Sequence, residues 1–251
     1  AQGRVTGVVG KKAIHLLKEE DRKKVVRVDQ MWIDIGAESA AAAREQVAVG
    51  DCAVIAQGFE ALPNGLAIAR GMDDRCGAFV VFEAARLAAT LNPQAEIVAV
   101  ATVQEEIGLR GATTSAYRLE PQVAIAVDVT HATDYPSMKE ERERLGRVRL
   151  GGGPVITRGA NINPRLFDHL VATAAAWQIP VQIVAEPRGT GTDANAIQLA
   201  RGGVATGLVS VPNRYMHTPV EMIALADLER AYTLLAHTVS AIGPDASFIP
   251  W

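Results

Sequence analysis

Two adjacent carboxylates, Glu105 and Glu106, closely follow an apolar run of the chain. The run, Ile97 to Val103, is short and rich in β-branched residues, which predicts a buried strand. Like charges at the end of such a strand repel each other and lose hydration, so a bound metal ion or a proton-transfer role would offset their cost. A turn in which both glutamates are solvated is the alternative, and the pair alone leaves this choice open.

Three more side chains of metal-binding type lie near predicted strand ends. Asp73 precedes a predicted buried helix, Asp128 ends an apolar run, and His217 follows another strand and a turn. Open α/β sheets place their sites at the carboxyl ends of strands, so we expect these side chains to meet Glu106 at one edge. Carboxylate and imidazole donors suit zinc, cobalt or manganese, whereas the lack of thiolates argues against a structural zinc site.

The elements that would position these residues are expected after residue 66, where apolar strands alternate with longer helices. This succession predicts an α/β fold with a mainly parallel sheet sandwiched by helices. Strands are predicted at 97–103, 123–127, 181–184 and 204–211, and helices at 77–91, 164–177, 193–200 and 224–242.

The chain before this region has a different character. It consists of short β-like runs separated by polar turns, with Ser39 as the N-cap of one short helix, 40–46. The sequence Leu62-Pro63-Asn64-Gly65 indicates a boundary. We therefore expect a small β-rich module, residues 1–62, followed by an α/β domain, residues 63–251.

Composition excludes several classes of partner. The 251 residues are 49% apolar and 21% charged, which indicates a soluble globular protein with a sizeable core. The formal net charge of −3 is too small to indicate binding to nucleic acid or anionic lipid. No apolar run is long enough to span a membrane and no signal peptide is evident, so we expect a cytoplasmic protein.

Five motifs occur in order along almost the whole chain: GMDDRCGAFV, TVQEEIGLRGA, AIAVDVTHATDYP, GTGTDANAI and VPNRYMHTPVE. Together they resemble the M42 family of dinuclear metallo-aminopeptidases, which includes the tetrahedral aminopeptidases and some members labelled as endoglucanases. The resemblance implies a zinc-peptidase-like fold and hydrolysis of N-terminal residues from short peptides with a free amino terminus. It also implies a homo-oligomer built from dimers, with twelve chains as one possible assembly.

The resemblance implies a role for each candidate residue. Asp73 would bridge two divalent ions, Asp128 would bind the first, Glu106 and His217 would bind the second, and Glu105 would be the general base. Zinc or cobalt would fill these sites, with manganese as an alternative. Residues 1–62 resemble the module that covers the active site and mediates dimerisation.

The chain departs from the family pattern at its start. In the family an HxD motif precedes the β-rich module, and its histidine completes the first metal site. Because this chain begins inside the module, we expect its first site to be incomplete and interpret the sequence as a fragment of a longer enzyme. His131, close to Asp128, is not expected to replace the missing ligand.

Two other functions are kept as alternatives. A glycoside hydrolase would also use paired carboxylates, although the motif order, His217 and an aromatic content of 5% favour the peptidase. A chain lacking one metal ligand could instead be a non-catalytic assembly subunit. The GxGxxA pattern at 189–194 is a weak dinucleotide fingerprint, because it comes late in the chain and no acidic residue follows about twenty positions on.

Overall fold

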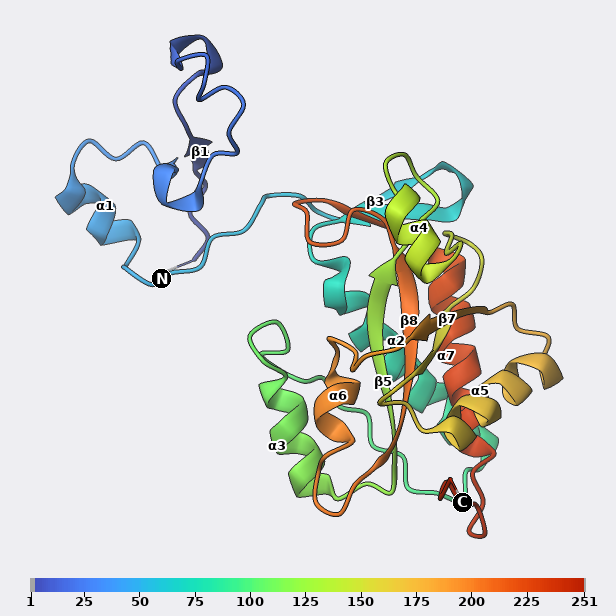
Figure 1. Ribbon diagram of the computed structural model, residues 1–251. Helices are drawn as coiled ribbons and strands as arrows, with labels where there is room; N and C mark the ends of the chain where they lie inside the picture. The colour runs from blue at the N-terminus through green and yellow to red at the C-terminus, as the bar shows by residue number, and fades with distance from the viewer. Residues whose placement is uncertain (1–2, 251) are drawn as a thin grey trace. The chain divides into compact units, whose positions relative to one another are not determined.

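The residue contacts divide the protein into two units, Ala1–Val54 and Ile55–Trp251 (Figure 1). This division comes from a computed structural model, which describes residues 3–250. All candidate site residues belong to the second unit.

The first unit has little regular structure. Strand β1 (Val8–Gly10) pairs antiparallel with β2 (Trp32–Asp34), and helix α1 (Ala40–Gln46) follows. The Ser39 hydroxyl accepts a hydrogen bond from the Ala42 N–H at 3.1 Å, which confirms the predicted helix and its N-cap. No residue between 3 and 54 is buried, so this unit has no apolar core of its own.

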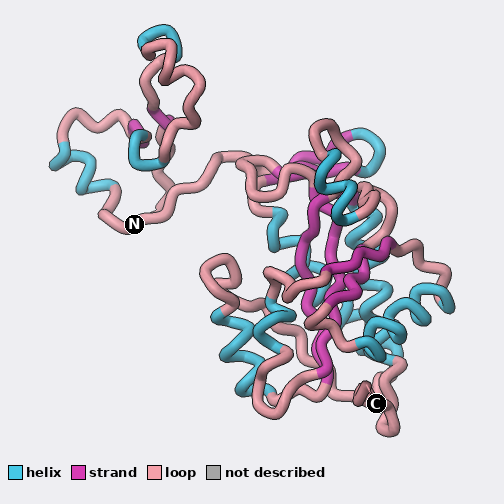
Figure 2. Tube along the Cα trace, in the orientation of Figure 1, coloured by secondary structure: helices cyan, strands magenta, loops and turns pink. Residues whose placement is uncertain are grey.

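The second unit is built on a four-stranded sheet with the order β5-β8-β6-β7, drawn in magenta in Figure 2. These strands are β5 (Val123–His131), β6 (Val155–Gly159), β7 (Gln182–Glu186) and β8 (Ala205–Asn213). β5 runs parallel to β8 and β6 runs parallel to β7, whereas β6 and β8 are antiparallel. The sheet is therefore mixed but largely parallel, and the predicted α/β fold is confirmed.

Helices α2 (Met72–Ala88), α5 (Pro164–Ala176) and α7 (Leu225–Ser240) share the main core with the sheet. Val80, Leu170, Val209 and Leu234 lie in this core and are almost fully buried. Helix α5 begins at Pro164 as expected. The Asn163 side chain caps it by accepting from the Leu166 N–H, which was not predicted. No helix among residues 3–250 is long and apolar enough to cross a membrane.

Smaller elements complete the second unit. Helix α3 (Arg110–Leu119) contacts α6 (Asp193–Ile197), and α4 (Lys139–Leu145) follows β5 (Figure 1). A second, antiparallel sheet has the order β3-β4-β9. Its strands are β3 (Glu60–Leu62), β4 (Leu66–Ala69) and β9 (Glu221–Ala224). Since β4 runs into α2 and β9 follows His217, this sheet joins two segments that carry candidate ligands.

The predicted strand at 97–103 is wrong as a sheet strand. Its side chains alternate between half-buried and exposed at Ile97, Val98 and Ala99, but it pairs with no strand among residues 3–250. An apolar, β-branched run predicts which side chains are buried, whereas a ladder also requires a neighbouring strand. The far end of the segment is fixed instead by the Gly111 N–H, which donates to the Val103 carbonyl at 2.8 Å.

Candidate metal centre

The second unit brings the predicted site residues together from four segments of the chain. Asp73 lies at the start of α2, Glu105 and Glu106 lie in the turn before α3, Asp128 lies in β5, and His217 lies between β8 and β9. Asp73 and Asp74 have non-helical backbone angles, so the regular part of α2 begins only after them. The four metal-ligand candidates fall into two groups of neighbouring donor atoms, which share Asp73.

The first group consists of Asp73, Glu106 and His217. One donor atom from each residue lies within 4.8 Å of the others, and His217 Nε2 is 3.0 Å from Asp73 Oδ2. The His217 side chain is 65% exposed, whereas that of Asp73 is 12% exposed. This group can therefore hold a cation from the protein side while leaving room for water or substrate on the other.

The second group consists of Asp73, Asp74 and Asp128, again with donor atoms within 4.8 Å of one another. Asp73 belongs to both groups, so its carboxylate can serve two neighbouring cations. Asp74 was not among the predicted ligands. Its Oδ1 accepts from the Gly77 N–H at 3.0 Å, which holds the carboxylate at the first regular turn of α2.

The electrostatics of the carboxylates favour a bound cation. Burial, together with the negative charge of Asp128, raises the pKa of Asp74 to about 9. Burial and the charge of Asp73 raise the pKa of Asp128 to about 7. Ionising all of these partly buried acids costs free energy because their negative charges repel one another. A divalent cation would offset that repulsion. The oxygen-rich donor set with one imidazole fits zinc, cobalt or manganese.

Glu105 lies beside the two groups and belongs to neither. Its carbonyl accepts from the N–H groups of Gly108 and Leu109, both at 2.9 Å, so the turn is tied to the start of α3. Burial, followed by the charges of Glu106 and Asp193, raises the pKa of the Glu105 carboxyl. A glutamate with a raised pKa next to a cation site is suited to accept a proton from water.

Asp193 fixes the segment before Glu105. Its Oδ2 accepts from the Thr102 hydroxyl at 2.5 Å, while the buried Oδ1 has no hydrogen-bond partner among the described residues. Asp193, the first residue of α6, therefore holds the segment before Glu105 through Thr102 and belongs to neither group.

The remaining histidines of this unit lie outside the two groups. His131, at the end of β5, is half-buried and joins neither group within residues 3–250. His169 Nε2 is 3.0 Å from the Thr238 carbonyl, and His237 stacks on Trp177 with ring centroids 3.6 Å apart. Both therefore have packing roles on their helices.

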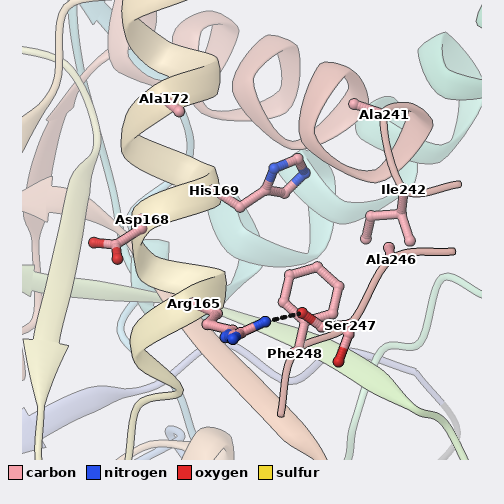
Figure 3. Close-up of a pocket in the computed structure, with 9 residues that line it drawn as sticks. All are labelled: Arg165, Asp168, His169, Ala172, Ala241, Ile242, Ala246, Ser247 and Phe248. Carbon is pink, nitrogen blue, oxygen red and sulfur yellow. Dashed lines mark hydrogen bonds between the residues drawn. The ribbon is translucent and has the colours of Figure 1, made fainter. Parts of the chain in front are cut away.

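A pocket beside α5 contains none of the candidate site residues. Figure 3 shows it between α5 and the segment after α7, where Arg165, His169 and Phe248 line it. Arg165 donates to the Ser247 carbonyl and Asn163 donates to the Phe248 carbonyl, so the pocket walls hold the end of the chain. It contains no cluster of metal-ligating groups among the described residues.

Comparison with known proteins agrees with this geometry. The sequence model of the M42 glutamyl aminopeptidases matches residues 1–234. The chain belongs to this family. It is 37% identical to the lysyl aminopeptidase of Pyrococcus furiosus over 97% of its own length and 69% of the relative's.

Solved structures of the family share the fold. A TET aminopeptidase from a marine sediment archaeon of the Thaumarchaeota superposes with a TM-score of 0.85 at 35% identity, covering 95% of this chain and 67% of that one. The TET1 peptidase of Pyrococcus horikoshii gives a TM-score of 0.80 at 33% identity, covering 94% and 68%. This M42 chain thus spans about two thirds of the length of these relatives. The predicted family and the aminopeptidase class of hydrolase are confirmed.

Proposed function

We propose that this M42 chain carries the catalytic centre of a metal-dependent aminopeptidase. In this proposal Asp73, Glu106, Asp128 and His217 hold two divalent cations, and Glu105 is the general base. The observation that carries it is the membership of Asp73 in both donor groups, each with donor atoms within 4.8 Å. A carboxylate shared between two groups could hold two cations close together, as two-metal hydrolases need.

The bound cations would supply an activated water and a polarised scissile carbonyl. Glu105 accepts a proton from the attacking water as the water oxygen bonds to the carbonyl carbon. It then delivers that proton to the departing nitrogen as the carbon–nitrogen bond breaks, which leaves a free amino acid and a shortened peptide. The exposed side of His217 leaves space for a substrate next to these groups.

The surplus of carboxylates also favours substrates with a free amino terminus. Asp74, Glu105 and Glu106 lie around Asp73, and an α-ammonium or amine group would find acceptors there. A buried peptide bond in the middle of a chain offers no such positive group. Zinc or cobalt is the proposed metal, with manganese as an alternative, since all three accept carboxylate and imidazole donors.

We also propose that the chain forms a cytoplasmic homo-oligomer built from dimers, in which residues 1–62 cover the site and mediate dimerisation. The TET1 peptidase of P. horikoshii is described as assembling into a tetrahedron or a large octahedral shell. In this chain Val8, Ile14 and Trp32 are exposed, and no residue between 3 and 54 is buried. Light scattering of the purified protein measures the assembly, and a monomer would contradict this part of the proposal.

The test of the function is the Glu105→Gln variant of the cobalt-loaded protein. Since glutamine cannot accept the proton, hydrolysis of an aminoacyl anilide should fall about 10²–10⁴-fold while cobalt binding stays unchanged. The matched control is Glu96→Gln, which alters an exposed glutamate on the same segment and should keep full activity.

Three results would contradict the proposal. An unchanged rate in metal-loaded Glu105→Gln would remove Glu105 from the mechanism. Cobalt binding without anilide hydrolysis in the wild type would favour the non-catalytic assembly subunit. Cleavage of a cellulose oligomer instead of the anilide would favour the glycosidase.

A further inference from the structure

A buried carboxylate, Glu221, lies behind the candidate metal centre. It is the first residue of β9, where it pairs with Ala69 of β4, and it is only 2% exposed. Burying a carboxylate is costly unless hydrogen bonds compensate for its lost hydration. The hydrogen bonds that Glu221 accepts within residues 3–250 come from N–H groups, and none comes from a lysine or arginine.

Two of these donors belong to the backbones of candidate ligands. Oε2 accepts from the Asp73 N–H at 3.1 Å, and Oε1 accepts from the His217 N–H at 3.2 Å. Oε1 also accepts from the side-chain amide of Asn213, at 3.2 Å. One side chain thus joins the start of α2 to the connection between β8 and β9.

The link matters because Asp73 and His217 reach the centre from segments far apart in the sequence. His217 has a φ of 62°, in the left-handed region that non-glycine residues rarely adopt, and its N–H points to Glu221. The two side chains then meet with Nε2 and Oδ2 3.0 Å apart. Both oxygens of Glu221 are occupied by N–H donors, so Glu221 itself is not arranged as a metal ligand.

We infer that Glu221 is a positioning residue that sets the distance between Asp73 and His217 by bonding to both backbones. This inference rests on the proposed function, since it assigns Glu221 a task toward the two ligands. Groups that orient metal ligands typically change metal affinity about 10–100-fold when they are removed.

The chain offers a matched control for a purely structural role. Asp227 is fully buried and accepts two backbone N–H bonds, from Gly151 at 2.7 Å and from Gly153 at 2.8 Å. Arg230 also donates to Oδ1 of Asp227, at 3.4 Å, and none of these partners is a site residue. Asp227→Asn therefore replaces a buried carboxylate by its amide, as Glu221→Gln does, away from the centre and with one weakened ion pair in addition.

The experiment compares wild type, Glu221→Gln and Asp227→Asn in the whole chain. In Glu221→Gln the side-chain NH₂ faces an N–H donor, so at least one of the bonds to Asp73, His217 or Asn213 is lost. We expect a changed imidazole ¹⁵N shift of His217 in the metal-free protein. We also expect a cobalt affinity about 10–100-fold lower and an altered visible absorption of bound Co²⁺. Asp227→Asn should keep the wild-type value of all three even if its melting temperature falls.

Wild-type signatures in Glu221→Gln, or equal changes in both variants, would overturn the inference. If the wild type binds no cobalt, the proposed function fails, and the metal-free His217 shift still decides whether Glu221 positions that residue. Should Glu221→Gln not fold, Glu221→Asp takes its place. It keeps two acceptor oxygens but is one methylene shorter, so the same changes are expected, and their absence would overturn the inference.

Discussion

Asp73 is in contact range of like-charged groups on two sides, with Glu106 in one group and Asp74 and Asp128 in the other. Burial, followed by the charges of Glu106 and Glu221, raises the pKa of Asp73. Without a cation this arrangement costs free energy, because each carboxylate disfavours ionisation of its neighbours. At the scale of single residues, the free-energy cost of ionising these neighbouring carboxylates is the strongest physical reason to propose a bound metal.

The residue-scale prediction concerns Asp134, which holds Arg214 in the segment before His217. The two side chains are 13% and 24% exposed, and Arg214 donates to both carboxylate oxygens at 2.7 and 2.8 Å. Asp134→Asn should lower the free energy of unfolding by about 1–3 kcal/mol at pH 7, measured by urea denaturation. The control Asp21→Asn breaks an exposed pair with Lys24 and should cost almost nothing.

The same pair gives a pH dependence with a definite sign. Burial alone would raise the pKa of Asp134, but the hydrogen bonds from Arg214 and the Leu150 N–H outweigh it and hold that pKa below its ordinary value. The folded state therefore binds fewer protons than the unfolded state, and the stabilisation is complete above about pH 5. It is lost as the pH falls through the folded pKa. A difference between wild type and Asp134→Asn that stays constant down to pH 2 would contradict this assignment.

At the scale of elements, the turn carrying Glu105 depends on the close approach of α3. The Gly111 N–H donates to the Val103 carbonyl, and a Cβ at Gly111 would overlap the Val103 backbone nitrogen and oxygen. Backbone atoms cannot move aside as the end of a flexible side chain can. A larger residue at this position must therefore push the segment before Glu105 away from the helix.

Gly111→Ala should reduce kcat for the aminoacyl anilide, by up to about 10²-fold, because it displaces Glu105, the proposed general base. Alanine alone would favour the helix by about 1 kcal/mol, so a loss of activity has to come from the displaced turn. Gly202→Ala is the control, since a Cβ there meets nothing within 4 Å. Equal kinetics in the two variants would show that the turn tolerates the shift.

The limits of sequence-based prediction are also clearest at the scale of elements. The apolar run of β8 and the N-cap at Ser39 led to the correct elements, since burial and capping are local signals. Helix α3 was missed because four of its residues, Gly111, Thr113, Thr114 and Ser115, are weak helix formers. Strand β6 was missed because it is only five residues long and follows a glycine-rich turn.

The candidate site also contains residues that were named from the sequence and residues that were missed. Glu106, Asp128 and His217 were expected to meet because strand ends converge in α/β folds. The structure groups each of them with Asp73, although Asp128 lies inside β5 and the segment before Glu106 pairs with no strand among residues 3–250. Asp74 and Glu221 were missed, since nothing in the local sequence separates a buried acid from an exposed one. Their roles depend on tertiary contacts, such as the bonds from Gly77 to Asp74 and from Asp73 and His217 to Glu221.

At the scale of the whole molecule, the second unit assembles the centre from segments that span residues 73 to 217. Strands β5 and β8 lie side by side in parallel and deliver Asp128 and the connection to His217, while the small sheet pairs Glu221 of β9 with Ala69 of β4. A bound metal would hold these segments together, so it should stabilise the folded state as any ligand of the native form does.

The most direct test of the account is the number of cobalt ions bound per chain at equilibrium, measured by elemental analysis after dialysis. We predict one tightly held ion in the group of Asp73, Glu106 and His217, and a second, weaker ion beside Asp128, whose site is expected to lack one ligand. Asp128→Asn should lose the weaker ion, and Asp73→Asn should hold none tightly, because Asp73 belongs to both donor groups. A wild type that binds no cobalt, or an Asp73→Asn variant that still binds two ions, would contradict the proposed two-metal centre.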